Sequence, residues 1–251
     1  MKGNLTRRGE RSWRLKYDVV GEGRRQTKYV TLHGTRKQAQ AEAAKILAGI
    51  ASGMHVDPST ETVGTFIERW LADWADSNVS NRTWTRYAGL LRGHVAVRVG
   101  SVPIQKLTAA HLQSIYAAMA RAGLSDRSRL HAHRVVSTML KHATQWGIVP
   151  RNVANMVNAP RVKARELEIL APAQVQQALE ALRGKPLYLI ALVLLTTGLR
   201  RGGALALRWQ DVDLESNTLR DEQAFEQTKR GGLIIKEPKS RHGRRTVTLP
   251  P

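Results

Sequence analysis

The chain has 251 residues, 42% of them hydrophobic, and its 40 Lys and Arg against 20 Asp and Glu give a formal net charge of +20. A charge of that size predicts a polyanionic partner, most commonly nucleic acid, although a ribosomal component or a merely soluble basic protein would share the composition. Zero cysteines exclude disulfides, thiolate metal sites and a cysteine nucleophile, and the lack of a long apolar run or a signal peptide predicts a soluble cytoplasmic protein.

The first 57 residues are predicted to form a small sheet followed by one helix. Residues 12–20 and 25–32 alternate and are rich in β-branched and aromatic side chains, with residues 21–23 as the turn between them. Residues 4–8 are a candidate third strand. Thr35 is a predicted N-cap for an alanine-rich helix that Gly53 ends.

Basic side chains are concentrated on the sheet part of this segment, as expected of a sheet that lies against a DNA groove. The alternative is an ordinary charged sheet with one solvated face. The candidate DNA contacts are Arg7, Arg8, Arg11, Arg14, Lys16, Arg24, Arg25 and Lys28.

Residues 58–160 are predicted to form a compact bundle of four helices. Thr62 can cap a helix whose apolar residues recur at helical spacing, and further helices are expected over residues 81–97, 109–122 and 126–146. Trp84 and Tyr87 could stack on DNA bases, but their spacing favours core positions. DNA contacts are expected instead from Arg82, Arg86, Arg92, Arg127, Arg129, Arg134 and Lys141, acting together on phosphates.

A proline-containing, mixed-charge linker over residues 158–168 leads to a third segment, residues 161–251, expected to mix helices and strands. A helix is predicted over residues 173–182. Residues 187–195, LYLIALVLL, are too short to span a bilayer and predict a buried helix that Gly198 ends. Residues 217–226, 232–236 and 244–249 are predicted as three short strands.

The run over residues 196–214, TTGLRRGGALALRWQDVDL, places Arg200 and Arg201 just beyond the apolar helix. A guanidinium suits phosphate binding because its planar fork donates two hydrogen bonds and keeps its charge. A solvated pair of arginines after a helix is the alternative. The order of TGLR, short helix, LRW and D-hydrophobic-D turn favours the phosphate site.

That order resembles the first catalytic motif of the tyrosine recombinases of the phage-integrase type. The resemblance extends to the N-terminal sheet, which is similar to an arm-type DNA-binding domain, and to the helical segment, where Thr83 and Tyr87 match a core-binding (SAM-like) domain. It implies a mainly α fold with small β elements, in which an incomplete α+β catalytic domain follows the sheet domain and the bundle.

By the same resemblance, Arg200 corresponds to the arginine that grips the scissile phosphate. Lys239, in the segment PKSRHGRRTVTLP, corresponds to the lysine that protonates the leaving 5′ oxygen, and Lys236 is the competing assignment. A solvated hairpin lysine is the alternative for Lys239. Further DNA contacts are expected from Arg201, Arg241 and Arg244.

The sequence departs from the family pattern in three places. Asn152 is followed by Val153 rather than proline, and Gly203 stands where the family usually has an acidic residue. The chain also ends at Pro251, before the expected position of the nucleophilic tyrosine. All five tyrosines precede Arg200: Tyr17, Tyr29, Tyr87, Tyr116 and Tyr188.

The function implied is the DNA-binding portion of a site-specific recombinase, which acts in DNA integration through a phosphotyrosine link. We expect the chain alone to bind DNA without cleaving it. The alternatives are a non-catalytic regulator or decayed remnant that occupies recombination sites, and a general nucleic-acid binder. The implied setting is a prokaryotic cell or a phage-encoded protein at the nucleoid.

The expected partner is double-stranded DNA with attachment and arm-type sites, on which the chain could form a homo-oligomer. No membrane contact, cofactor or metal is expected. Acidic pairs such as Asp211 and Asp213 could suggest magnesium, but they are better explained as residues that fix a turn. No P-loop, nucleophile elbow or Rossmann glycine motif is present.

Overall fold

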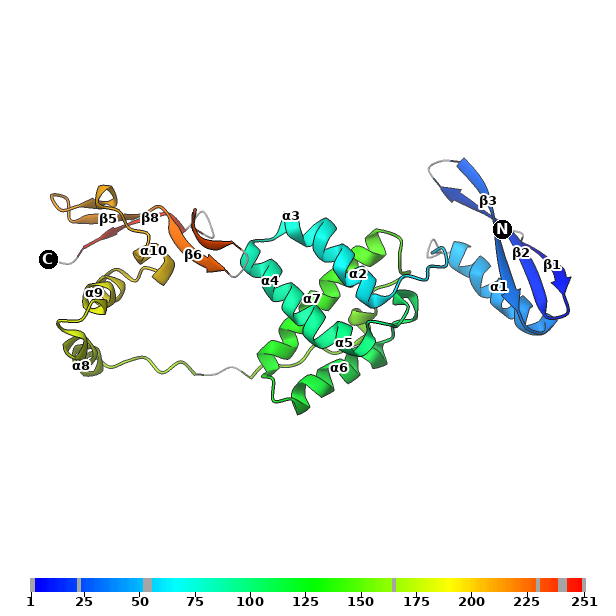
Figure 1. The fold of residues 1–251 in the computed structure, drawn as a ribbon, viewed down its shortest axis with the longest axis horizontal. Coiled ribbons are helices and arrows are strands. Elements are labelled where there is room, and N and C mark those ends of the chain that lie inside the picture. Colours follow the sequence, from blue (N-terminus) through cyan, green and yellow to red (C-terminus); the bar gives the residue numbers. More distant parts are fainter. Residues whose placement is uncertain are drawn as a thin grey trace. The chain divides into compact units, whose positions relative to one another are not determined.

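The computed structural model describes residues 3–21, 24–51, 56–163, 166–228, 231–238 and 243–249. The chain divides into two compact units. Unit 1 comprises Met1–Ala75 and Tyr87–Val162, and unit 2 comprises Asp76–Arg86 and Lys163–Pro251. The elements are mainly helices with three small sheets, which confirms the predicted fold class (Figure 1).

The N-terminal part of unit 1 is an antiparallel sheet with one helix against it. Strands β1 (Asn4–Gly9), β2 (Ser12–Gly21) and β3 (Arg24–His33) pair in chain order, and α1 (Arg36–Ala51) follows. Thr35 begins the helix as predicted: the Gln38 backbone N–H donates to Thr35 Oγ1 at 3.4 Å, and Thr35 N–H donates to Gln38 Oε1 at 2.8 Å. The predicted turn residues Glu22 and Gly23 and the predicted stop Gly53 lie outside the described residues.

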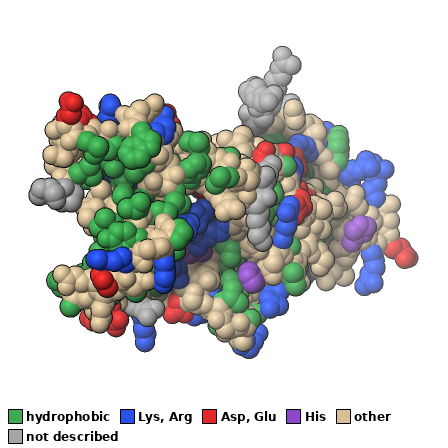
Figure 2. Space-filling view, turned by 60° about the vertical axis from the view of Figure 1, so that its left-hand side comes forward, with side chains coloured by type: hydrophobic (Ala, Val, Ile, Leu, Met, Phe, Trp, Pro, Cys, Tyr) green, Lys and Arg blue, Asp and Glu red, His purple; other side chains and the backbone are tan. Residues whose placement is uncertain are grey.

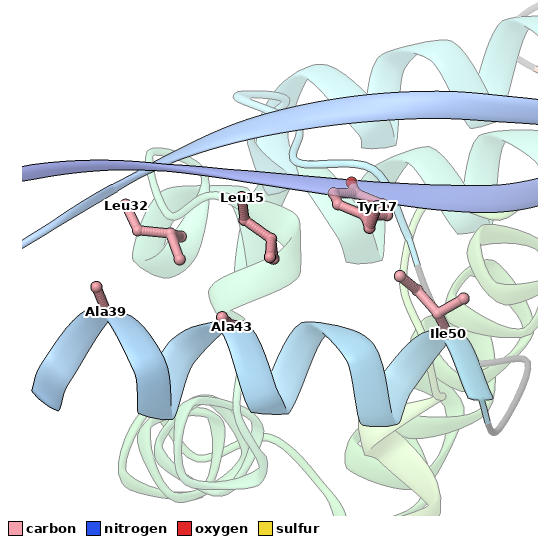
Figure 3. Packing of buried hydrophobic residues seen from close by; sticks show 6 residues of the cluster. All are labelled: Leu15, Tyr17, Leu32, Ala39, Ala43 and Ile50. Carbon is pink, nitrogen blue, oxygen red and sulfur yellow. The ribbon is translucent and has the colours of Figure 1, made fainter. Parts of the chain in front are cut away.

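A small apolar core joins this helix to the sheet. Figure 3 shows Leu15, Tyr17 and Leu32 pointing from the strands toward α1, which presents the short side chains of Ala39 and Ala43 and, near its end, Ile50. Leu15, Tyr17 and Leu32 are at most 4% exposed. The short side chains of Ala39 and Ala43 let α1 lie close to the sheet. The helix can therefore cover the apolar face of the sheet although it contributes few large side chains.

The rest of unit 1 is helical, and its helices continue through residues 76–86, which are assigned to unit 2. Its first helix α2 (Val63–Trp70) continues through η1 (Leu71–Ala75) into α3 (Asp76–Asn78), and α4 (Asn81–Leu90) continues through η2 (Leu91–Ala96) into α5 (Val97–Val99). Both η1 and η2 are π-helical turns that the sequence does not predict. A 3₁₀ turn, η3 (Ile104–Lys106), leads to α6 (Ala109–Arg121), α7 (Asp126–Gln145) and a second 3₁₀ turn, η4 (Val153–Met156).

The predicted caps and core of the helical part are confirmed. Thr62 and Thr108 each form a capping box with the third residue of the following helix, which satisfies backbone N–H groups that the helix leaves free. The predicted stripe on α2 is buried, with Val63, Phe66 and Trp70 fully inaccessible. Trp70 also donates its indole N–H to His142 Nδ1 at 2.8 Å, which ties α2 to α7.

Most of unit 2 lies after the linker. Helices α8 (Pro172–Leu182), α9 (Leu187–Thr197) and α10 (Arg201–Ala204) come first, followed by the 3₁₀ turn η5 (Trp209–Asp211). The remainder forms β4 (Val212–Asp213), β5 (Thr218–Asp221), β6 (Ala224–Thr228), β7 (Gly232–Lys236) and β8 (Arg245–Thr248).

The single strand predicted over residues 217–226 is wrong. The structure divides this segment into β5, which belongs to the antiparallel sheet β4-β5-β8, and β6, which pairs with β7 in a separate sheet. Gln223 lies at the break and donates its side-chain amide to the carbonyl oxygen of Ala206 at 2.9 Å. At Gln223 the chain leaves the sheet β4-β5-β8, and the next strand, β6, pairs with β7 instead.

The prediction that residues 187–195 form a buried helix is wrong in one respect: the helix forms, but its apolar side chains are exposed. Leu187 is 60% exposed and Leu189 is 68% exposed. Helix α9 is apolar all round, and the short helices α8 and α10 that pack on it cannot cover every side. Hydrophobic side chains accordingly crowd the surface at the left of Figure 2. Within the described ranges, no helix is both long and apolar enough to span a membrane.

Candidate phosphate-binding site and nucleic-acid interface

Arg200 lies at the junction between α9 and α10, where the backbone is held by local contacts. Gly198 ends α9 in the left-handed conformation, with φ of 61°, and its N–H donates to the Leu194 carbonyl at 3.1 Å. Leu199 is 6% exposed and anchors the turn in the interior, whereas the side chain of Arg200 is exposed. The junction therefore presents one guanidinium from a fixed backbone.

The strand β8 and the segment before it support this junction from a distance in sequence. Arg245 Nη2 donates to the Gly198 carbonyl at 2.7 Å. Gly243 lies so close to the arginine that a methyl group on its Cα would be 3.7 Å from Arg200 Nη1. The backbone around Gly243 therefore forms one wall of the space that the guanidinium of Arg200 occupies.

A cleft lined by both charged and apolar side chains contains this guanidinium. Arg201, Asp221, Phe225, Lys236 and Pro238 all line it together with Arg200. Lys236 on β7 makes an ion pair with Glu226 on the paired strand β6, and the side chain of Glu226 is only 9% exposed. The carboxylate of Glu226 holds the ammonium of Lys236 at one wall of the cleft. A phosphate bound to Arg200 would be attracted by the positive charge of this ammonium.

Two of the predicted site residues here lie outside the described residues, namely Lys239 and Arg241. Lys239 directly follows Pro238, which lines the cleft. Arg244 is described, and its guanidinium donates to Glu237 Oε1 at 2.6 Å. Both lysines considered for proton transfer therefore belong to the stretch that follows β6, and neither assignment is tested by this geometry.

The acidic turn after the arginine motif is held by hydrogen bonds. Arg208 donates twice to Asp211, at 2.8 Å to each carboxylate oxygen, and this contact lowers the pKa of Asp211. Asp213 Oδ1 accepts the backbone N–H groups of Glu215 and Ser216. Both aspartates are thus engaged in fixing the turn, and the described residues contain no group of three His, Asp or Glu that could hold a metal.

The predicted DNA-contacting residues of the N-terminal sheet are divided between its two faces. Leu15 and Tyr17 face α1, so Arg14 and Lys16, which alternate with them on β2, belong to the outer face. Arg7 is opposite Trp13 and Lys28 is opposite Tyr17, which places both on the α1 side.

Not all of these basic side chains are available on the surface of the sheet. Lys28 makes an ion pair with Asp57. Arg8 and Arg11 are exposed, whereas the side chains of Arg24 and Arg25 lie outside what the structure describes. The outer face therefore offers Arg14 and Lys16, with the Arg14 guanidinium over the Tyr29 ring at 5.7 Å.

The predicted basic residues of the helical part fall into two groups. Arg127, Arg134 and Lys141 are exposed and repeat every seven residues along α7, so they form one line on that helix, here called the α7 stripe. Arg92 and Arg129 instead make ion pairs with Glu68 and Asp126. Arg82 and Arg86 are exposed on α4.

Comparison with known proteins adds sequence and fold evidence to this geometry. Residues 62–120 match the family described as the phage integrase N-terminal SAM-like domain. The chain is 25% identical over 231 residues to a tyrosine recombinase XerC-like protein of Caldanaerobacter subterraneus subsp. tengcongensis, a match that covers 86% of this chain and 59% of the relative. It is also 25% identical over 244 residues to an integrase of Saccharopolyspora erythraea, over 73% of this chain and 55% of the relative.

The chain is thus similar in sequence to tyrosine recombinases and integrases. Solved structures share its fold: the Tn1549 transposon integrase with a circular intermediate DNA has a TM-score of 0.65 at 22% identity, covering 76% of this chain and 61% of that one. A lambda integrase tetramer bound to a Holliday junction has a TM-score of 0.55 at 18% identity, covering 93% and 66%. This chain spans between one half and two thirds of the length of these proteins.

Sequence reasoning missed one buried acidic residue near this site, Asp221. It is 4% exposed at the end of β5, and its Oδ1 lies 2.7 Å from the place that a Cβ on Gly203 would occupy. Burial raises the pKa of Asp221, while the positive charges of Arg245 and then Arg200 lower it. No local sequence signal identifies this residue, because its neighbours Gly203 and Arg245 come from segments distant in sequence.

Proposed function

We propose that this chain is the DNA-binding portion of a site-specific tyrosine recombinase, and that Arg200 binds the phosphate at which the strand is exchanged. The observation that carries this proposal is the fixed junction at Arg200. Its backbone is held by the Gly198 turn and by Arg245, while its guanidinium remains open to the cleft. A phosphate in that cleft would receive two hydrogen bonds from one planar group.

The chemistry proposed for the site is stabilisation of charge on a phosphodiester during phosphoryl transfer. Arg200 would hold the non-bridging oxygens, and a lysine of the stretch after β6, Lys239 or Lys236, would supply a proton to the leaving 5′ oxygen. Lys236 is ion-paired with Glu226. To donate a proton to the leaving oxygen, Lys236 would have to exchange Glu226 for the substrate.

We further propose that two other surfaces bind the DNA backbone. These are the outer face of the sheet, with Arg14 and Lys16, and the α7 stripe. Both offer cations on regular elements, half-buried at Arg14 and exposed at Lys16 and along the α7 stripe, which suits phosphate positioning rather than the reading of bases. In this proposal residues 1–57 are an arm-type module, 58–160 a core-binding module and 161–251 part of a catalytic module, and copies of the chain assemble on DNA.

A selection experiment tests the proposal. The 251-residue chain is incubated with a library of random duplexes at several salt concentrations, and the bound fraction is sequenced. We expect affinity to fall steeply with salt and particular sequences to be enriched. Salt-dependent binding with no enrichment would contradict site-specific binding and leave a general nucleic-acid binder.

The contribution of Arg200 is tested by substitution. Arg200→Ala is expected to weaken binding to an enriched duplex by about tenfold, because a charge-assisted hydrogen-bonding group is lost from the cleft. The matched control is Arg183→Ala, which removes an exposed arginine of α8 that pairs with Glu180 in the same unit. Equal losses for the two variants would show that Arg200 acts only through net charge.

A further inference from the structure

Asp221 and Arg245 are directly opposite each other on neighbouring strands. The register of β5 and β8 pairs their Cα atoms, so both side chains are on the same face of the sheet β4-β5-β8. Asp221 is 4% exposed, whereas Arg245 is exposed and reaches Gly198 with its guanidinium. A buried carboxylate is thus placed beside the arginine that supports the Arg200 junction.

The carboxylate of Asp221 lies where a side chain at position 203 would begin. A Cβ on Gly203 would lie 2.7 Å from Asp221 Oδ1 and 3.2 Å from Oδ2, closer than real side chains approach. Gly203 is itself buried in α10, three residues after Arg200. The side chain of Asp221, on β5, therefore lies beside α10 in the space where a side chain at position 203 would be.

Arg245 and Arg200 are the two cations whose charges act on this carboxylate. Both Arg245 and Arg200 act on the pKa of Asp221 in the direction that favours its ionised form, against the effect of burial. The attraction is mutual, and it is stronger at a buried site than in bulk water because the local dielectric is lower. The same charge therefore restrains the guanidiniums of Arg245 and Arg200.

We propose that Asp221 is a positioning residue for Arg200: it occupies the space beside Gly203, holds Arg245 across the strand pair and sets the direction of the Arg200 guanidinium in the cleft. This inference rests on the proposed function of Arg200 as the phosphate-binding group. In this proposal the carboxylate that acts on Arg200 comes from β5, because α10 contains no acidic residue.

The first test compares the effect of Arg200→Ala in three backgrounds by measuring affinity for a duplex from the library selection. The backgrounds are the native chain, Asp221→Asn and Glu222→Gln. Glu222 is the adjacent exposed acid, so the last two variants remove the same charge and differ only in position. We expect Arg200→Ala to cost about tenfold in the native and Glu222→Gln backgrounds and about twofold or less in Asp221→Asn. Equal costs in Asp221→Asn and Glu222→Gln would overturn the proposal.

The second test moves the carboxylate to α10. Asp221→Ala combined with Gly203→Asp is expected to restore the full effect of Arg200→Ala, since the charge returns to the same space from the other side. Asp221→Ala combined with Gly203→Ala fills that space without charge and is not expected to restore it. Equal restoration by the two combinations would show that packing, rather than the carboxylate, is what Asp221 contributes.

A third measurement needs no DNA and separates failure of this inference from failure of the proposed function. The Arg200 Nε–Hε resonance, assigned by its loss in Arg200→Lys, is followed by NMR in the free protein. We expect slow exchange with water in the native chain and in Glu222→Gln, and fast exchange in Asp221→Asn. An unchanged exchange rate in Asp221→Asn would overturn the inference. Absence of DNA binding by a chain that shows the expected exchange pattern would overturn the proposed function alone.

Discussion

At the scale of single residues, Gly202 and Gly203 are two neighbouring glycines with different reasons to be glycine. Gly203 leaves room for the end of a side chain, that of Asp221. Gly202 faces the backbone, because a Cβ there would lie 2.8 Å from the carbonyl oxygen of Phe225 on β6. A side chain can rotate away from an added methyl group, whereas a strand carbonyl cannot move without disturbing its ladder.

Gly202→Ala is therefore expected to destabilise unit 2 by about 1–3 kcal/mol, the usual cost of forcing extra volume into a packed contact. Chemical denaturation monitored by circular dichroism measures the loss. The control is Gly89→Ala on the exposed side of α4, where no atom lies within 4 Å of the added carbon. That change should be neutral or stabilising by up to about 1 kcal/mol, because alanine is the better helix former. A neutral Gly202→Ala would show that α10 and β6 are less closely packed than described.

His142 predicts a pH dependence of stability. Its Nδ1 accepts the indole N–H of Trp70, and burial, followed by the charge of Lys141, lowers the pKa of the imidazole. The unfolded chain then takes up the proton more readily than the folded chain. This contribution to stability is complete above the unfolded pKa of about 6.5 and is lost as the pH falls through the lower folded pKa.

Unfolding free energies measured between neutral and mildly acidic pH should therefore decrease toward acid, and His142→Gln should reduce that decrease. His133, whose pKa is also lowered by burial and by Arg134, supplies the part that remains. A His142→Gln variant with the full native pH dependence would contradict this assignment.

At the scale of elements, α9 shows that an apolar sequence can determine a helix without determining whether that helix is buried. The composition of residues 187–195 correctly predicts a helix, but burial depends on what other elements are placed against it. Leu189 remains 68% exposed on α9, while Leu219 on β5 is 3% exposed in the same unit. Two leucines of equal hydrophobicity thus have different energetic roles.

Leu189→Ala is expected to change the unfolding free energy by less than about 1 kcal/mol, whereas Leu219→Ala should cost about 2–5 kcal/mol through lost burial and a cavity. Denaturant titrations of the two variants test this contrast. A large loss for Leu189→Ala would mean that α9 is covered in solution, for example by association of two chains.

The features predicted correctly from sequence are those set by short-range interactions. The caps at Thr35, Thr62 and Thr108 depend on a side chain and a backbone N–H three residues apart, and the stripe on α2 depends only on helical spacing. The break between β5 and β6 and the placing of Asp221 beside Gly203 depend on contacts between distant segments. The flanking motif singles out Arg200, but the contacts of Arg245 and Gly243 at its junction also join distant segments.

At the scale of the whole molecule, a net charge of +20 makes DNA affinity sensitive to salt regardless of sequence. The structure distinguishes cations that are available from cations that are engaged. Arg14 and Lys16 belong to the outer face of the sheet, whereas Lys28 is on the α1 side and is paired with Asp57. Equal changes in formal charge should therefore have unequal effects on binding.

We expect Arg14→Gln combined with Lys16→Gln to reduce the slope of log K against log salt by about one to two, since each phosphate contact contributes about 0.9. Lys28→Gln should change the slope by less than about 0.5, because its charge is already neutralised by a partner. Fluorescence anisotropy with a labelled duplex at several salt concentrations measures both. Equal changes per charge would indicate that DNA does not use the outer face.

The hydrogen bond from Arg245 to the Gly198 carbonyl joins positions 47 residues apart. During synthesis, the arginine motif leaves the ribosome before the strand that steadies it has been translated. A nascent chain that has exposed Arg200 but not Arg245 therefore carries the Arg200 junction without this hydrogen bond. The junction is complete only after β8, the last strand of its sheet, has been translated.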